Sequence, residues 1–182
     1  DITDCGFLGT SPAFDGSTWV NVGTLGDFGL NLKAGVIDVM FKTEGTAERM
    51  TLLGVTDSPG KHPGFSIDFN TGLNMQFQRH CVCIWFRDYH GHTSRCCAEL
   101  PAVFDNAWHS LSLRVMDIDT AHFRFRIDGR LVDAASSSQA SSEGFLNLAH
   151  PLGVGCHNDR SKQSQFFKGS IRALKLGVSH ID

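Results

Sequence analysis

Apolar residues alternate with polar ones in several short runs of this chain, and this pattern constrains the fold more than any other feature. The clearest runs are FSIDF at 65–69, LSLRV at 111–115 and FRFRI at 123–127. A period of two is typical of a β-strand with one side in a core and the other in water. Each run therefore predicts a strand with one buried face and one wet face.

Turn-forming residues separate these runs and predict how the strands are connected. Asp128-Gly129 is expected to form a tight hairpin turn, and Gly169 is expected to let the chain enter its last strand closely packed. Trp108 and Leu111 are expected to anchor one edge of the core. Convincing helical periodicity is absent, so the pattern predicts an all-β, antiparallel two-sheet sandwich.

Composition limits the number of domains and the kinds of partner. A chain of 182 residues that is 41% hydrophobic suits a single domain spanning residues 1–182. The net charge of -3 and the lack of a dense Lys/Arg run in the sequence argue against nucleic acid as a partner. No apolar run approaches the ~20 residues that span a bilayer, so membrane insertion is not expected.

Four of the six cysteines fall in the window HCVCIWFRDYHGHTSRCCAEL, residues 80–100. If Val82, Ile84 and Phe86 face the core, strand alternation places Cys81, Cys83 and Trp85 on the opposite face. The adjacent Cys96 and Cys97 must then point to different faces, so the four thiols cannot converge on a zinc ion. A turn near 89–91 would place Cys83 opposite Cys96 or Cys97, which favours a disulfide-braced hairpin over zinc.

Four longer segments resemble the laminin-G-like domains of the concanavalin A-like lectin/glucanase superfamily, and they follow one another in the same order as in that family. The resemblance rests on two main segments and two shorter ones, and it implies a jelly-roll sandwich. These are FDNAWHSLSLRVMDIDTAHFRFRIDGRLVD (104–133), PLGVGCHNDRSKQSQFFKGSIRALKLGV (151–178), AFDGSTWVNVG (13–23) and GFSIDFNTGLNMQFQ (64–78).

The resemblance also implies a second disulfide and a candidate ion. In this fold type the first strand lies near the closing strands, so Cys5 is expected to pair with Cys156, although six cysteines allow 15 connectivities. Disulfides imply a secreted protein or the extracellular face of a cell. Many relatives hold Ca²⁺ at a loop rim, and Asp57 and Asp159 are the candidate ligands here.

Signs of catalysis are weak. The paired carboxylates of glycosidases on alternate strand residues are missing; the nearest match, Asp117 and Asp119, falls at a predicted turn. No Gly-x-Ser-x-Gly elbow occurs. A polysaccharide lyase that uses Arg87, Tyr89, His90 and His92, or a glycosidase, remains a minor alternative.

The predicted function is therefore binding, either of a carbohydrate or, as the alternative, of a cell-surface or matrix protein. Sugar sites combine an aromatic platform with polar groups for the hydroxyls. The cysteine-rich hairpin and the loop CHNDRS offer this mixture, although Trp85 could instead pack beneath a loop. The candidate ligand-binding residues are Trp85, Arg79, Arg87, Tyr89, His90, His92, His157, Asn158, Asp159 and Arg160.

Overall fold

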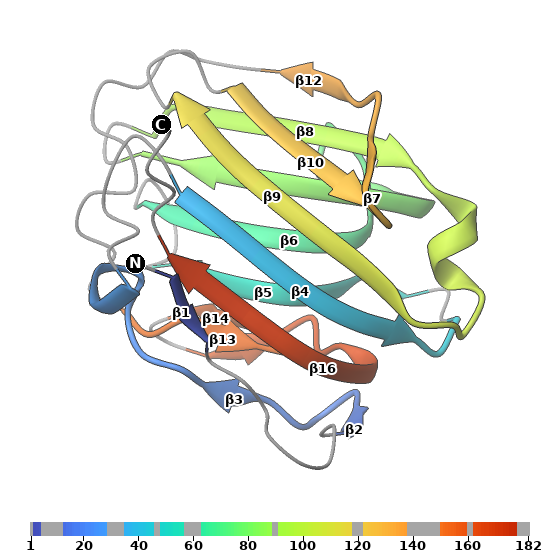
Figure 1. Cartoon of the computed structure of the whole chain (residues 1–182), viewed down its shortest axis with the longest axis horizontal. Coiled ribbons are helices and arrows are strands. Elements are labelled where there is room, and N and C mark those ends of the chain that lie inside the picture. Colours follow the sequence, from blue (N-terminus) through green and yellow to red (C-terminus); the bar gives the residue numbers. More distant parts are fainter. Residues whose placement is uncertain are drawn as a thin grey trace.

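The computed structural model contains two β-sheets stacked face to face, as Figure 1 shows. It describes residues 2–4, 13–28, 35–45, 48–56, 63–88, 91–117, 122–137, 150–159 and 162–177. The described strands pair antiparallel except for one short parallel pair, β5 with β14. The predicted all-β sandwich is confirmed.

The first sheet, called the front sheet, crosses nearest the viewer in Figure 1. Its strand order is β1-β16-β4-β9-β10-β11, and β2 also pairs with β16. The bounds are β1 (Ile2–Asp4), β2 (Ala13–Asp15), β4 (Gly35–Thr43), β9 (His109–Asp117), β10 (His122–Ile127), β11 (Arg130–Leu131) and β16 (Lys168–Gly177).

The second sheet, called the back sheet, has the order β12-β8-β7-β6-β5-β13-β3, with β14 and β15 beside β5. Its bounds are β3 (Val20–Asn21), β5 (Met50–Thr56), β6 (Gly64–Thr71), β7 (Phe77–Arg87), β8 (Thr93–Glu99), β12 (Ala135–Ser137), β13 (Gly153–Val154), β14 (His157–Asp159) and β15 (Gln163–Ser164). Two short 3-10 helices, η1 (Leu25–Phe28) and η2 (Pro101–Phe104), complete the described elements. Within the described residues, no helix is long and apolar enough to cross a membrane.

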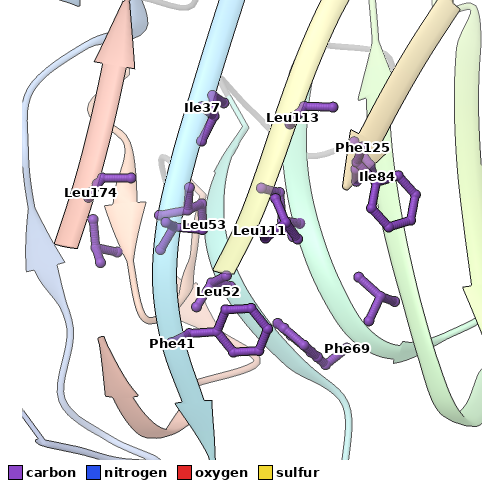
Figure 2. Packing of buried hydrophobic residues seen from close by; sticks show 14 of the residues in the cluster. Ile37, Phe41, Leu52, Leu53, Phe69, Ile84, Leu111, Leu113, Phe125 and Leu174 are labelled. Atoms are coloured by element: carbon purple, nitrogen blue, oxygen red, sulfur yellow. The ribbon is translucent and has the colours of Figure 1, made fainter. Parts of the chain in front are cut away.

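The core lies between the two sheets and is built from their inward-facing side chains (Figure 2). Ile37 and Leu113 come from the front sheet, and Leu53 and Ile84 come from the back sheet. Aromatic rings bridge the layers, as where Phe41 of β4 meets Phe69 of β6 edge-to-face at 5.2 Å between centroids. Burial of this apolar surface is the main force that stacks the sheets.

The predicted turn chemistry is confirmed. Asp128 and Gly129 have φ angles of 50° and 76°, the left-handed values that a tight hairpin turn between β10 and β11 needs. At Gly169 a Cβ atom would lie 1.9 Å from the carbonyl oxygen of Lys42, so only glycine allows β16 to pack so closely there.

Two expectations about individual faces were wrong. Trp108 does not anchor the core, because 37% of it is exposed beside the front sheet, whereas Leu111 is buried as expected. The non-core face of β6 is not wet either, since Ser66 and Asp68 are each only 1% exposed. Strand alternation gives the face of a residue correctly, but it does not show whether another part of the chain covers that face.

Candidate functional site

The β7–β8 hairpin forms the disulfide that the alternation predicted. Cys83 pairs directly with Cys97 in the hairpin register, and their sulfurs are bonded. Cys81, Cys83 and Cys97 form a small buried cluster on the outer face of the back sheet, whereas Cys96 belongs to the main core. The thiols are therefore split between two faces, as expected, and the disulfide is confirmed over zinc.

The other described cysteines, Cys81, Cys96 and Cys156, are buried thiols. Burial raises the pKa of Cys96 to about 11 and that of Cys156 to about 12. Burial, followed by the nearby Glu99 carboxylate, also raises the pKa of Cys81. Cys156 forms no disulfide with a described cysteine; its predicted partner, Cys5, lies outside the described residues, so that bond stays a prediction.

The strand register brings the predicted site residues of the hairpin and of the CHNDRS loop onto one face. Arg87 of β7 pairs with Gly64 of β6, Gly64 pairs with Thr56 of β5, and Thr56 pairs with Asp159 of β14. These residues form a row across four strands on the outer face of the back sheet. We call this region, together with Trp85, Arg95 and His157, the back-face site.

Trp85 lies on the predicted face, but its ring is not an open platform. It is 6% exposed and covers the space above Gly64, where a Cβ atom would lie 2.6 Å from the indole. The guanidinium of Arg87 lies over the ring at 5.1 Å from its centroid, and the His157 ring lies 6.3 Å away. Trp85 therefore packs beneath Arg87 instead of facing solvent directly.

Two arginines lie next to this tryptophan, one over its ring and one beside it on the neighbouring strand. Arg95 of β8 pairs with Trp85 in the register, and Arg87 is the second residue after Trp85 on β7. Burial, followed by the charge of Arg95, lowers the pKa of Arg87, while Asp159 opposes that shift. Burial also lowers the pKa of Arg95. The site therefore holds two cations that have lost part of their hydration and repel each other.

Only some of the hydrogen-bond donors of Arg95 have a partner in the protein. One Nη1–H donates to the carbonyl oxygen of Leu73 at 3.0 Å. Its Nε atom is buried and has no hydrogen-bond partner among the described residues. A buried donor without an acceptor is unfavourable by roughly 1–3 kcal/mol, so an added acceptor at this atom would stabilise the site.

A buried polar network supports the floor of the back-face site. The hydroxyls of Ser66 and Thr51 donate to the two oxygens of Asp68, each at 2.7 Å. Thr56 Oγ1 and His157 Nε2 lie 2.7 Å apart. Burial raises the pKa of Asp68, although the nearby charge of His157 acts in the opposite direction. Burial lowers the pKa of His157, although the nearby charge of Asp68 acts in the opposite direction.

The tip of the β7–β8 hairpin is ordered by a residue that the sequence analysis did not select. Asp88 is fully buried and accepts hydrogen bonds from the backbone N–H of His92 at 2.8 Å and from its Nδ1 at 3.0 Å. His92, which was selected, is therefore fixed beside the end of β7. Tyr89 and His90, also selected, lie outside the described residues.

The remaining predicted site residues differ in their placement. Asn158 is buried and structural: its amide donates to Pro151 O at 2.8 Å and accepts from Gln163 at 3.0 Å. Arg79 is exposed on β7 six residues before Trp85, which along a strand is about 20 Å away. Arg160 lies outside the described residues.

Metal binding receives no support from the described residues. They contain no group of three or more His, Cys, Asp or Glu side chains that could serve as ligands. Asp57, half of the predicted calcium pair, lies outside the described part of the chain. Calcium binding through Asp57 and Asp159 therefore stays a prediction.

Arg95 and Asp68 were missed, for different reasons. The predicted hairpin register would have located Arg95, because pairing Cys83 with Cys97 places Arg95 opposite Trp85. Asp68 had no such signal, since its position in an alternating strand predicts a solvated side chain.

Comparison with known proteins identifies the architecture. No family model and no curated protein matches the sequence. Solved structures do match, among them the CBM40 module of the Ruminococcus gnavus IT-sialidase bound to α2,3-sialyllactose. Its TM-score is 0.68 at 16% identity, and the match covers 96% of this chain and 92% of the module.

Two further matches come from other kinds of protein. Domain 4 of an extracellular arabinanase from Geobacillus stearothermophilus, solved with arabinotriose, has a TM-score of 0.63 at 15% identity over 100% of this chain and 77% of that one. Mouse laminin α1 domains LG4-5 have a TM-score of 0.61 at 19% identity over 94% and 42%. The chain thus has a concanavalin A-like, laminin-G-like β-sandwich fold, which agrees with the predicted resemblance.

Proposed function

We propose that this chain is a non-catalytic carbohydrate-binding module, and that the back-face site binds a glycan carrying a carboxylate or a similar anionic group. The observation that carries the proposal is the pair of partly desolvated arginines, Arg87 and Arg95, on adjacent strands. Bound between them, an anion would relieve their mutual repulsion.

Arginine suits this task better than lysine. Its planar guanidinium donates two parallel hydrogen bonds to a carboxylate, which adds orientation as well as energy. Arg95 Nε needs an acceptor, and Arg87 is oriented by its contact with Trp85. Trp85 is then a positioning residue beneath the site, while His157 and Asp159 border it.

The comparisons and the covalent structure support the same proposal. One matching module was solved with sialyllactose, an acidic oligosaccharide, and another with arabinotriose, a neutral one. The Cys83–Cys97 disulfide suits a secreted protein or the outer face of a cell. We propose accordingly that the module acts outside the cell and attaches a larger protein to glycans.

Binding to a glycan array that includes sialylated, uronate-containing and neutral oligosaccharides tests the proposal. We expect acidic glycans to bind and their neutral counterparts to bind at least tenfold more weakly, because a charge-assisted hydrogen bond contributes about 1.5–3 kcal/mol. A silent array, or equal binding of neutral glycans, would contradict the proposal. A silent array would favour the alternative, a protein partner.

A matched pair of variants locates the site. Arg87→Met keeps a side chain over Trp85 but removes the charge, and it should weaken binding of the acidic glycan by about tenfold or more. Arg130→Met removes the same charge from exposed β11 and should leave binding unchanged. Thermal melting of both variants checks that the fold is intact.

A further inference from the structure

The outer face of the front sheet is strongly cationic. In each of its long strands the residues that alternate with the core residues point outward, and many of them are basic. Among the described side chains, its strands carry two acids on this face, Asp38 on β4 and Asp15 on β2. Its cations are Lys42 on β4, Arg114 on β9, Arg124 and Arg126 on β10, and Lys168, Arg172 and Lys175 on β16, of which Lys168 is paired with Glu48.

The strand register places these cations next to one another. Arg124 pairs with Arg114, and Arg126 pairs with Ser112, which in turn pairs with Asp38. Asp38 pairs on its other side with Lys175. Neighbouring strands lie about 4.8 Å apart and alternate residues of one strand about 7 Å apart, so the charges form a close array across four strands.

Most of these cations are exposed and lack a counter-ion. Arg124, Arg126, Arg172 and Lys175 are exposed. None of these four forms an ion pair with a described residue, and Arg126 donates only to the carbonyl oxygen of Gly129 at 3.0 Å. Because the whole chain has a net charge of -3, this face is positive against the overall balance.

Trp108 positions two of the cations at one end of the array. The ammonium of Lys42 lies 5.8 Å from the centroid of its ring, and the guanidinium of Arg172 lies 6.0 Å from it. Such contacts orient a cation without neutralising it. The exposed indole therefore keeps Lys42 and Arg172 together beside the sheet.

The observations favour a polysaccharide as the occupant. A membrane surface would need a cluster of apolar side chains to insert. The large exposed hydrophobic residues on this face among those described are Trp108 and Leu131, and each lies beside cations, Trp108 beside Lys42 and Leu131 opposite Arg126. Single-stranded nucleic acid would need an aromatic ring for its bases, but cations already lie over the Trp108 ring. An array of cations of which four are exposed and form no ion pair with a described residue fits a chain with closely spaced anionic groups.

We propose that the outer face of the front sheet binds a linear polysaccharide that carries closely spaced sulfate or carboxylate groups. This site is separate from the back-face site, on the opposite side of the sandwich, and does not depend on the proposed function. Counter-ions released from the polyanion would make its affinity fall steeply with salt.

Binding to heparin, as the sulfated probe, and to polygalacturonate, as the carboxylate-only probe, over a series of salt concentrations tests this proposal. Arg124→Ser/Arg126→Ser should weaken the binding of the preferred probe about tenfold and reduce the slope of log affinity against log salt by about two. The double variant should retain binding of the acidic oligosaccharide at the back-face site. Binding of neither probe would overturn the proposal.

The control is Arg130→Ser/Lys162→Ser, which removes the same charge at two exposed positions away from this face. Arg130 pairs with Ile127 and so points toward the opposite side of the sheet. Affinity for the polysaccharide should be unchanged in this control. An equal loss in the control, or no loss in Arg124→Ser/Arg126→Ser, would overturn the proposal.

Trp108 gives a separate readout because it is a positioning residue. Trp108→Leu should lower affinity about threefold while leaving the salt slope unchanged, since the number of cations is the same, and Trp108→Phe should restore part of the affinity. Vesicles of phosphatidylcholine with phosphatidylserine, or a single-stranded oligonucleotide, should bind more weakly than the polysaccharide. Equal or tighter binding of either would overturn the choice of a polysaccharide.

Discussion

The outer faces of the two sheets are built from the same alternating pattern but have opposite environments. On the back sheet the outward residues Ser66 and Asp68 are buried, and Asp68 accepts hydrogen bonds from Ser66 and Thr51. On the front sheet the outward residues of β10 are exposed arginines. The difference teaches that a polar position in a strand can serve either as the buried support of a site or as the binding surface itself.

Removing the buried carboxylate should have the largest effect on stability. Asp68→Ala leaves the Ser66 and Thr51 hydroxyls without their acceptor, and we expect a loss of about 4 kcal/mol in the free energy of unfolding. The matched change on the front sheet, Asp38→Ala, should stay within about 0.5 kcal/mol. Urea denaturation measures both, and equal losses would contradict the contrast between the faces.

The disulfide should contribute the next largest effect. Cys83→Ala/Cys97→Ala removes a cross-link between residues 14 positions apart, and the loop it closes suggests a loss of about 3 kcal/mol. Mapping of thiols in denaturant without reductant should label Cys81 and Cys96 but not Cys83 or Cys97. Labelling of Cys83 and Cys97 would show that this bond is absent.

Two histidines should give smaller effects of opposite sign with pH. His157 on the back face is partly buried, and its desolvation lowers its pKa. The unfolded chain then binds a proton near pH 6.5 but the folded chain does not, so stability falls as pH falls. For His109, burial alone would lower the pKa, but hydrogen bonds to Asp128 at 2.8 Å and Asp105 at 2.9 Å outweigh it and raise the pKa. The stability that protonated His109 contributes is fully present below about pH 6.5. It is lost as the pH rises through the pKa of His109 in the folded protein.

Unfolding of His157→Gln and His109→Gln over about pH 5 to pH 8 tests this contrast. Relative to the unmodified chain, His157→Gln should gain on the order of 1 kcal/mol toward the acid end, and His109→Gln should lose a similar amount there. If both variants changed in the same direction, the assigned pKa shifts would be wrong for one of them.

Local chemistry predicted much of the fold. The period-two runs predicted β6, β9 and β10, and Asp128-Gly129 predicted the β10–β11 turn. The placement of Cys96 and Cys97 on different faces predicted that only one of them could bond to Cys83. Each of these follows from neighbours in the sequence or from one hairpin. The role of Trp85 was less predictable, because its burial depends on Arg87 above it and on Gly64 below it.

The sequence alone therefore determined several of the strands, several of the chain's turns, and which side of these strands each side chain faces. Tertiary structure decided which faces are covered and which charges meet. Lys42, Arg124 and Lys175 are too far apart in sequence to form a basic run, yet three neighbouring pairings in the front sheet gather them on one surface. The reason is physical: alternation is local, whereas burial and electrostatics depend on long-range strand pairing, which no short segment specifies.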